Sequence, residues 1–324
     1  MTPPVTNPDL TVLMAVYNQQ THVARAITSI LTQTLRDVDF LIVDDGSTDA
    51  TPDILARHAA AESRIRLLTL PQNGGLAAAL QAGLAATDAT FVARMDSDDI
   101  SCPERLAIQL ATLRGSRLDI LGAGQTRGPR GLLDIWPALS LDHGTIIATL
   151  PRRNVLAHPS VMFRRAVIGA AGGYDPRFKL AQDYDLWLRL IGQARFGNLG
   201  RKLVVSPTNC TRASGPANRQ RHTVFSVTAA TNHFLRARAL TPLDPSGPVD
   251  ILGLALAALV RQSTRAEAQD IIRHAIRLVR YASPAPPVTA EIRDAICEKA
   301  NLHARMKWRA YALGPLTSAP VLSG

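Results

Sequence analysis

Residues 40–49 read FLIVDDGSTD, an apolar run that stops at two aspartates and a cluster of turn-forming residues. Four consecutive apolar residues predict a short strand that is buried on both faces. Asp, Gly, Ser and Thr are the residues that turn a chain and cap the first turn of a helix. This stretch therefore predicts a buried strand, a turn that carries two carboxylates, and a helix that begins near Thr51.

The same succession of strand, loop and helix occurs before and after this stretch. Strands are expected at Leu10–Val16, 40–43, 65–70 and 91–93, and helices at Val23–Leu31, 51–58 and 76–86. Strands that alternate with helices of about ten residues predict a parallel sheet with helices on both faces. The predicted fold class is α/β.

Polar residues follow three of these strands at the point where each strand ends, namely Tyr17-Asn18, Asp44-Asp45 and Asp96 to Asp99. In an open parallel sheet, ligands bind beyond the carboxyl ends of the strands, so these side chains are expected to converge. No G-x-G-x-x-G follows the first strand and no G-x-x-x-x-G-K-[ST] occurs in the chain. These absences argue against a dinucleotide enzyme and a P-loop nucleotidase.

The pattern is weaker beyond residue 116. The glycine-rich stretch 121–131 predicts a loop or an edge hairpin, 158–163 predicts the opening of a strand, and 182–190 predicts a helix. Beyond residue 248 the chain is mainly helical, and 271–279 alternates arginines with apolar residues as in a basic amphipathic helix. We expect a disordered N-terminus at 1–8, a catalytic domain at 9–215 and a helical, basic C-terminal region at 216–324.

The net charge of +10 belongs almost entirely to the C-terminal third. Residues 1–200 hold 19 basic and 19 acidic residues, whereas residues 201–324 hold 17 and 7. Such asymmetry predicts an anionic partner, and a basic amphipathic helix favours an anionic membrane surface. The alternatives are a solubilising surface and a helical lid packed on the catalytic domain. An aromatic content of 5% without any recognition motif argues against nucleic acid.

The cysteines and the N-terminus indicate the compartment. Cys102, Cys210 and Cys297 are odd in number and show no metal-binding spacing, which favours a reducing environment. The first ten residues lack the basic and apolar regions of a signal peptide. The longest apolar run, 251–260, is half of the roughly 20 residues that a membrane-spanning helix needs. We expect a cytoplasmic protein that is either soluble or peripheral on the inner face of the cell membrane.

Asp96-Ser97-Asp98 places two carboxylates around one serine after a strand. Hard oxygen ligands suit Mg²⁺ or Mn²⁺, which is commonly held by one or two carboxylates together with the phosphates of a substrate. The segment therefore predicts a clamp for a diphosphate and a metal. Taken alone, these aspartates and Asp44-Asp45 are more often helix caps or turn formers.

Seven segments together resemble the family 2 glycosyltransferases, inverting enzymes with the GT-A nucleotide-diphospho-sugar transferase fold, a Rossmann-like mixed sheet flanked by helices. The segments are Ala15-Val16-Tyr17-Asn18, Val43-Asp44-Asp45-Gly46-Ser47-Thr48-Asp49, Asn73-Gly74-Gly75-Leu76, Arg94-Met95-Asp96-Ser97-Asp98-Asp99, His158-Pro159-Ser160, Gly172-Gly173-Tyr174-Asp175 and Gln182-Asp183-Tyr184-Asp185-Leu186-Trp187. The resemblance covers residues 9 to 205. It leaves a mainly helical extension, 215–324, without a counterpart.

The resemblance implies a binding site for a nucleotide-sugar donor. Tyr17 would stack on the nucleotide base, and Asp45 would accept a hydrogen bond from a base N–H. Asp96 would reach the ribose or the donor sugar, and Arg94 would lie against the sugar or the phosphate. The full set of implied donor-binding residues is Ala15, Val16, Tyr17, Asn18, Asp44, Asp45, Gly75, Arg94, Asp96 and Ser97.

The resemblance also implies a metal and a general base. Asp98 would bind the Mn²⁺ or Mg²⁺ that bridges the diphosphate, with Asp96 and His158 as further candidates. A lone histidine before Pro-Ser is, however, more often a hydrogen-bonding loop residue. Asp183 would take the proton of the acceptor hydroxyl, although without the family its position favours a helix N-cap. Trp187 faces the core by its helical phase, and stacking on an acceptor sugar is the alternative.

The chain departs from the family pattern at two places near the expected chemistry. Gln182 stands where the family has Glu. The segment 209–214 lacks the histidine of the family pattern, and its Arg212 would replace a cationic contact with the phosphates. Two hypotheses follow. The first is a metal-dependent inverting glycosyltransferase that moves a sugar from a nucleotide diphosphate, with a UDP-sugar favoured, to a hydroxyl of a cell-surface glycan or lipid-linked acceptor. The alternative is a catalytically silent scaffold of the same fold that binds sugar nucleotides or glycans.

Overall fold

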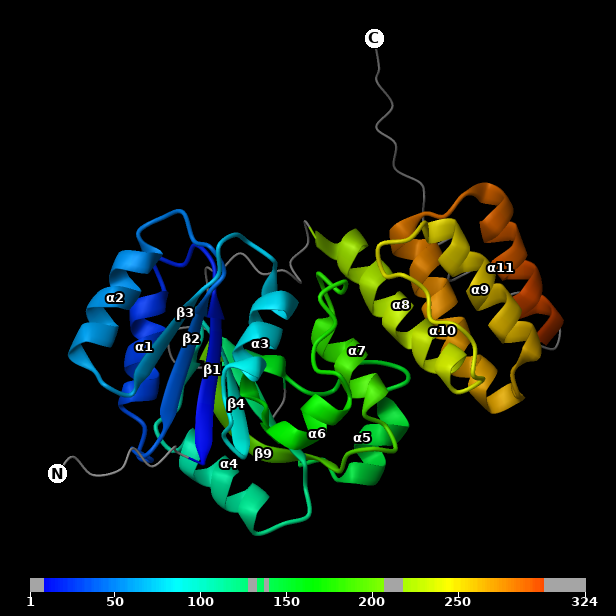
Figure 1. Ribbon diagram of the computed structural model, residues 1–324. Helices are drawn as coiled ribbons and strands as arrows, with labels where there is room; N and C mark the ends of the chain where they lie inside the picture. The colour runs from blue at the N-terminus through cyan, green and yellow to red at the C-terminus, as the bar shows by residue number, and fades with distance from the viewer. Residues whose placement is uncertain (1–8, 128–132, 137–139, 207–217, 300–324) are drawn as a thin grey trace. The chain divides into compact units, whose positions relative to one another are not determined.

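The computed structural model describes residues 9–127, 133–136, 140–206 and 218–299 (Figure 1). The chain divides into two compact units, residues 1–211 and residues 212–324. The predictions for residues 1–8 and for Arg212 concern residues outside these described ranges. Each unit has a core of its own and is described by itself.

A nine-stranded mixed sheet forms the centre of the first unit, in the order β3-β2-β1-β4-β8-β6-β9-β5, with β7 paired to β6. Strands β3, β2, β1 and β4 are parallel neighbours, and β8 then runs antiparallel to both β4 and β6. This arrangement confirms the α/β class and the mixed sheet. The strands are β1 (Leu10–Val16), β2 (Asp39–Asp44), β3 (Ile65–Thr69), β4 (Phe91–Asp96), β5 (Ile100–Ser101), β6 (Ile120–Arg127), β7 (Leu133–Trp136), β8 (Met162–Arg164) and β9 (Phe196–Ser206).

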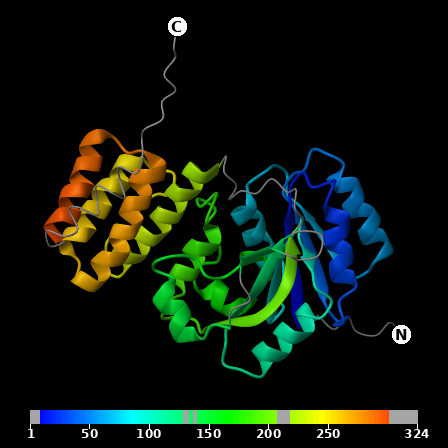
Figure 2. The same cartoon turned by 180° about the vertical axis from the view of Figure 1, so that it is seen from behind.

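Helices cover both faces of the parallel half of the sheet, as the continuous apolar strands predict (Figures 1 and 2). Residues of α1 (Val23–Leu31), α2 (Thr51–Ala61) and α4 (Arg105–Arg114) share one core with alternate residues of β1 and β2. The opposite face receives α3 (Leu76–Ala85). A Cβ built on Gly83 of α3 would lie 2.3 Å from Leu13 Cδ1, so this glycine permits close packing of helix on strand.

The structure corrects the prediction for 121–131. Residues 120–127 form β6, a strand between β8 and β9 and not a loop, whereas the predicted hairpin is present, because the end of β6 pairs antiparallel with β7. Gly122 hides the strand pattern, yet it is needed there, because a Cβ would lie 2.4 Å from Asn198 Oδ1. The strand expected at 158–163 is also shorter, since His158–Ser160 is a 3₁₀ turn and β8 begins at Met162.

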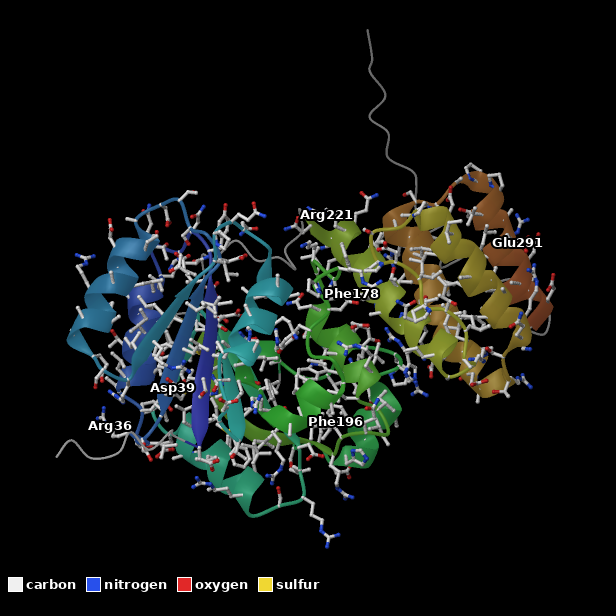
Figure 3. The ribbon with its side chains drawn as sticks, viewed as in Figure 1. Arg36, Asp39, Phe178, Phe196, Arg221 and Glu291 are labelled. Atoms are coloured by element: carbon white, nitrogen blue, oxygen red, sulfur yellow. The ribbon has the colours of Figure 1, made fainter. Side chains whose placement is uncertain are left out.

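Three further helices complete the first unit: α5 (His143–Thr149), α6 (Arg165–Ala170) and α7 (Gln182–Arg189). The connection from α6 to α7 contains Phe178, which is buried and is labelled in Figure 3. The helix predicted at 182–190 is therefore present. Its first turn carries Asp183.

The described part of the second unit consists of helices α8 (Arg219–Arg236), α9 (Val249–Gln262), α10 (Arg265–Ala282) and α11 (Pro286–Lys299). Arg261 of α9 pairs with Glu291 at 2.5 Å and with Glu298 at 2.7 Å on α11 (Glu291 is labelled in Figure 3). Thr264 and Glu267 form a capping box at the start of α10. The helical C-terminal region is confirmed over residues 218–299.

The apolar side of α10 is buried within this helical unit. Ile271, Ala275 and Leu278 belong to a core shared with α8, α9 and α11. The amphipathic helix is therefore present as predicted, and its apolar stripe packs inside the helical unit. Within the described residues, no helix combines the length and hydropathy required to cross a bilayer.

Candidate active site

The register of the parallel strands gathers the expected donor-binding residues at one edge of the sheet. Ala15 on β1 lies opposite Asp96 on β4, and Val16 lies opposite Asp44 on β2. Tyr17 follows directly and is the most exposed of these side chains, at 42%. The convergence expected from the strand ends is therefore present in the fold.

Asn18 connects the loop after β1 to the loop after β2. Its backbone N–H donates to Ser47 Oγ at 3.0 Å, and its Oδ1 accepts from the Thr48 N–H at 2.8 Å. The φ of Asn18 is +51°, a left-handed conformation that asparagine tolerates better than most residues. Asn18 thus holds the two loops in one arrangement beside Tyr17.

Asp45 connects the same edge to the loop before α3. Its Oδ1 accepts from the Gly74 N–H at 2.9 Å, and its Oδ2 accepts from the Gly75 N–H at 2.8 Å. Gly75 has a φ of +88°, which a residue with a Cβ rarely adopts. Both carboxylate oxygens therefore already hold the loop, and a contact with a base would use their remaining acceptor capacity. Neighbouring Asp44 is buried and accepts from the Ser47 N–H at 3.1 Å.

Strand β4 extends through Asp96, three residues further than the sequence predicts, so Arg94 and Asp96 share one face of the strand. Arg94 is 2% exposed, and its Nη2 lies 2.5 Å from Asp96 Oδ1. Burial acts to lower the pKa of Arg94, but the charge and hydrogen bond of Asp96 outweigh it and raise that pKa. Nε and Nη1 of Arg94 have no hydrogen-bond partner among the described residues.

The turn after β4 holds Ser97, Asp98 and Asp99. Ser97 is buried and Asp98 is half-buried. Asp99, which the sequence reading did not single out, is buried and accepts hydrogen bonds from Gln125 Nε2, at 2.8 Å, and from the Ser206 hydroxyl. Burial, followed by the negative charges of Asp96 and Asp98, raises the pKa of Asp99 to about 8. The two half-buried carboxylates, Asp96 and Asp98, are therefore the ones placed to meet a ligand.

His158 lies in a buried polar cluster with Tyr174 and Trp187. Its Nε2 lies 2.8 Å from the Tyr174 hydroxyl, and its ring meets the edge of Trp187 at a centroid distance of 6.2 Å. Burial, together with the Arg94 charge, holds the pKa of His158 well below its ordinary value. The contact with Tyr174 agrees with the hydrogen-bonding interpretation of His158, and its role as a metal ligand stays a prediction.

Trp187 is fully buried, and its Nε1 has no hydrogen-bond partner among the described residues. A ring without an exposed face cannot stack on an acceptor sugar. The expected acceptor contact is therefore wrong, and the interpretation from helical phase, which placed Trp187 in the core, is right.

Asp183 lies in the first turn of α7, but it is not the cap of that helix. The N-cap position is Ala181, with a φ of +56° and no side-chain capping bond. Asp183 Oδ2 instead accepts a hydrogen bond from Asn154 Nδ2 at 2.7 Å. The N-cap interpretation of Asp183 is thus wrong. Asn154, which the sequence reading missed, is its partner across 29 residues of chain.

Tyr174 is a buried residue of the segment before α7, and its phenol lies against His158. Burial raises the pKa of Tyr174, and the carboxylates of Asp183 and Asp96 act in the same direction, against the effect of Arg94. The phenol therefore stays protonated in this cluster.

The loop that leads to α7 is also fastened to the donor edge. Lys179 Nζ donates to the Gly74 carbonyl at 2.8 Å, and the Tyr174 N–H donates to Gln81 Oε1 on α3 at 2.9 Å. No pattern in the sequence indicates either contact. Together they link the segment that leads to α7 with α3 and with the Gly74-Gly75 loop that Asp45 holds.

The residues at the end of β4 fit a divalent cation that a diphosphate helps to bind. Their donor atoms are carboxylate oxygens, the type that Mg²⁺ and Mn²⁺ prefer. Across residues 9–127, 133–136, 140–206 and 218–299, no three His, Cys, Asp or Glu side chains form a group suited to holding a metal. A metal here would be held by Asp98 and Asp96 together with substrate phosphates.

A mixed sheet flanked by helices, with carboxylates where its parallel strands end, defines a glycosyltransferase of the GT-A class. The family model described as Glycosyl transferase family 2 matches residues 11–169. The chain is 32% identical over 199 residues to the O-antigen biosynthesis glycosyltransferase WbnJ of Escherichia coli, covering 60% of this chain and 78% of WbnJ. The chain belongs to glycosyl transferase family 2.

A second relative and two solved structures agree with this assignment. The putative glycosyltransferase EpsE of Bacillus subtilis (strain 168) is 31% identical over 192 residues, covering 56% of this chain and 66% of EpsE. S. aureus TarS 1–349 in complex with UDP-GlcNAc has a TM-score of 0.60 at 16% identity, covering 94% of this chain and 90% of that one. The mannosyltransferase PcManGT from Pyrobaculum calidifontis, in complex with GDP-Man and Mn²⁺, has a TM-score of 0.52 at 18% identity. The match covers 95% of this chain and 86% of the PcManGT chain. These structures show the shared fold.

Proposed function

We propose that this glycosyltransferase is a metal-dependent, inverting enzyme that moves a sugar from a nucleotide diphosphate, with a UDP-sugar favoured, to a hydroxyl group of a cell-surface glycan or lipid-linked acceptor. The observation that carries the proposal is the gathering of the donor-side residues where β1, β2 and β4 end, with the segment that leads to Asp183 hydrogen-bonded to the same edge through Lys179 and Gly74. This arrangement supports one site that combines donor-facing carboxylates with an anionic base. The relatives in O-antigen biosynthesis support a surface glycan as the product class.

The donor would bind along the ends of β1, β2 and β4. Tyr17 offers an exposed ring for stacking on the base, and Asp45 offers carboxylate oxygens beside it. Arg94 brings a positive charge to the end of β4, and its Nε and Nη1 have no hydrogen-bond partner in the part of the chain that the structure describes. The neighbouring folds that bind UDP, UDP-GlcNAc and GDP-Man support a nucleotide-sugar donor.

Asp98, with Asp96 beside it, would hold Mn²⁺ or Mg²⁺ against the diphosphate. The bound cation supplies charge stabilisation for the leaving nucleoside diphosphate without any proton transfer. The PcManGT structure, which contains Mn²⁺, supports a divalent metal for this fold. Asp99 would stay in its bonds to Gln125 and Ser206 and hold the turn in place.

Asp183 would act as the general base. It takes the proton of the acceptor hydroxyl while the hydroxyl oxygen forms a bond to the anomeric carbon, and the bond from that carbon to the diphosphate breaks. Attack from the face opposite the nucleotide inverts the anomeric centre. The side chain of Asp183 is half-buried and already held by Asn154, which is the setting that a positioned base requires.

A panel of nucleoside diphosphates tests the donor site directly. We expect one nucleotide, UDP first among UDP, GDP and dTDP, to raise the melting temperature in the presence of Mn²⁺ or Mg²⁺ and not in the presence of a chelator. Selective binding to the folded state raises apparent stability by mass action, about 2.7 kcal/mol at a hundred times the dissociation constant. Differential scanning fluorimetry measures the shift. A nucleotide that stabilises equally well with the chelator would contradict the metal clamp.

The alternative function is a catalytically silent scaffold that binds sugar nucleotides or glycans. Gln182 favours it, because this residue replaces a carboxylate next to Asp183 and is itself buried at the start of α7. Such a scaffold would bind the nucleotide in the panel and release no product. Turnover in the wild-type chain, lost on changing Asp183, decides between the two functions.

The second unit offers a basic stripe for an anionic partner. Arg273, Arg277 and Arg280 recur on one side of α10, and none forms an ion pair with another described residue. Since the apolar side of α10 is buried, any association with a membrane through this stripe would be electrostatic. This supports a partner such as anionic lipid.

We expect the full chain to sediment with vesicles of 30% phosphatidylglycerol at low salt and to be released at high salt, because screening weakens contacts between exposed charges. Changing Arg273, Arg277 and Arg280 together to Gln should reduce the bound fraction severalfold. A matched control changes three exposed arginines of the first unit, Arg57, Arg117 and Arg195, to Gln. Equal losses in both triple variants would show a general charge effect and no role for the α10 stripe.

A further inference from the structure

The hydrogen bond between Asn154 and Asp183 is a contact of the expected base that no sequence motif accounts for. Asn154 Nδ2 donates to Asp183 Oδ2 at 2.7 Å. Asn154 lies between α5 and the 3₁₀ turn that begins at His158, well before α7 in the chain. It is therefore a separate element that reaches the carboxylate from outside its own helix.

A second hydrogen bond fixes the direction of the Asn154 amide. Its Oδ1 accepts from the Leu156 N–H at 3.1 Å, so the carbonyl end of the amide is already used. A carboxylate can only accept hydrogen bonds, and a backbone N–H can only donate them. The NH₂ group must consequently face Asp183, since the flipped amide would lose both bonds.

The segment that bears Asn154 is anchored on both sides. Tyr184, the residue after Asp183, donates its hydroxyl to the Leu150 carbonyl at 2.7 Å. Leu156 and Ala157, which follow Asn154, are buried in the core. The distance between the amide and the carboxylate is thus set by packing on either side.

Asp183 receives this hydrogen bond from a segment outside its own helix. The N-cap of α7 is Ala181, and a side chain at the second position of a helix has several rotamers available. A hydrogen bond from a neutral amide also stabilises the charged form of a carboxylate relative to the protonated form. Asn154 therefore restricts the rotamer of Asp183 and favours its ionised state.

We infer that Asn154 is a positioning residue for proton transfer, one that holds Asp183 ionised and aimed during glycosyl transfer. The inference rests on the proposed function, in which Asp183 is the base. Asn154 acts through Asp183 and is not itself required for donor binding. Loss of its amide should accordingly change the rate and the pH profile of the reaction while leaving nucleotide affinity unchanged.

The test compares Asn154→Ala and Asn154→Asp with the wild-type chain. Activity is the release of nucleoside diphosphate from UDP-, GDP- and dTDP-hexoses with water as acceptor and Mn²⁺ present. For Asn154→Ala we expect kcat to fall about tenfold to a hundredfold. A positioned base contributes about 10²- to 10⁴-fold to the rate, and loss of its orientation removes part of that contribution. In the plot of kcat against pH, the midpoint of the fall on the acid side should shift to a higher pH by about one unit. Asn154→Asp should move it further, because two carboxylates would then meet.

Asn232→Ala is the matched control for loss of a structural amide. Asn232 on α8 exchanges two hydrogen bonds with the backbone of Leu243, at 2.7 and 3.0 Å, and lies in the other compact unit. It should lower the melting temperature without moving the pH profile. Nucleotide affinity, measured by calorimetry, should stay within twofold of wild type in the Asn154→Ala variant.

The outcomes separate this inference from the function on which it rests. An active wild type with unchanged kcat and acid limb in Asn154→Ala would overturn the inference alone. A fall in kcat matched by a loss of nucleotide affinity, with the acid limb unmoved, would also overturn it and assign Asn154 to the fold. A wild-type chain that releases no nucleotide from any donor would overturn the proposed function and this inference with it.

Discussion

Asp183→Asn is expected to lower the rate of donor turnover about 10³-fold while nucleoside diphosphate affinity stays within twofold of wild type. The amide has the shape of the carboxylate but cannot take a proton from a hydroxyl, and a positioned base is worth about 10²- to 10⁴-fold. Asn154 still has an oxygen to bond with, so the fold around the first turn of α7 should persist. Product release, followed against calorimetric binding of the same nucleotide, separates the two effects.

Asp175→Asn is the control for this change. Asp175 lies in the same connection before α7 and pairs with Arg177 at 2.7 Å, and this pair is exposed on the Arg177 side. Its replacement should leave turnover within a few-fold of wild type. If both variants lose activity alike, the loop and not the base is responsible. If Asp183→Asn keeps full activity, the base is another group, and the proposed mechanism fails.

Asp98→Asn is expected to remove the dependence of nucleotide binding on metal and to lower turnover by about 10²-fold or more. A cation at a developing diphosphate charge supplies several kcal/mol of stabilisation, and loss of one well-placed electrostatic partner costs about 10²- to 10³-fold. A titration of Mn²⁺ in the presence of the selected nucleotide, followed by calorimetry, measures the coupling. The wild type should show it and the variant should not.

The neighbouring carboxylate provides the matched control. Asp99→Asn changes the same functional group one residue away, but Asp99 is buried and bonded to Gln125 and Ser206. It should alter stability and leave the metal dependence in place. Loss of metal dependence in Asp99→Asn with none in Asp98→Asn would reverse the assignment of the ligand.

The parallel half of the fold was predictable because each of its elements is specified locally. Strand β2 is a continuous apolar run bounded by turn formers, and α2 begins after a cluster of capping residues, so no distant information was needed. The later strands are different. Strand β6 contains two glycines within five residues and is stabilised by pairing with β8 and β9, which are remote in sequence. The local sequence pattern alone cannot identify strands, such as β8 and β9, that pair with β6 from distant parts of the chain.

The same distinction holds for the candidate site. The aspartates after β2 and β4 could be found because carboxylates at strand ends form a pattern. Asn154 could not, since an asparagine in a loop is ordinary and its partner lies 29 residues away. Helical phase correctly assigned Trp187 to the core, and residue type correctly favoured a hydrogen-bonding role for His158, although its partner Tyr174 could not be named from the sequence.

The ion pair of buried Arg94 with half-buried Asp96 bears on how silent members of this family should be recognised. Arg94 is almost fully enclosed, and Asp96 balances its charge at 2.5 Å. Loss of the Asp96 carboxylate would leave that enclosed charge without this partner and would destabilise the fold. Selection for folding alone would therefore preserve Asp96 in a lineage that had stopped transferring sugars. Retention of Asp96 is thus a poor marker of activity in this branch.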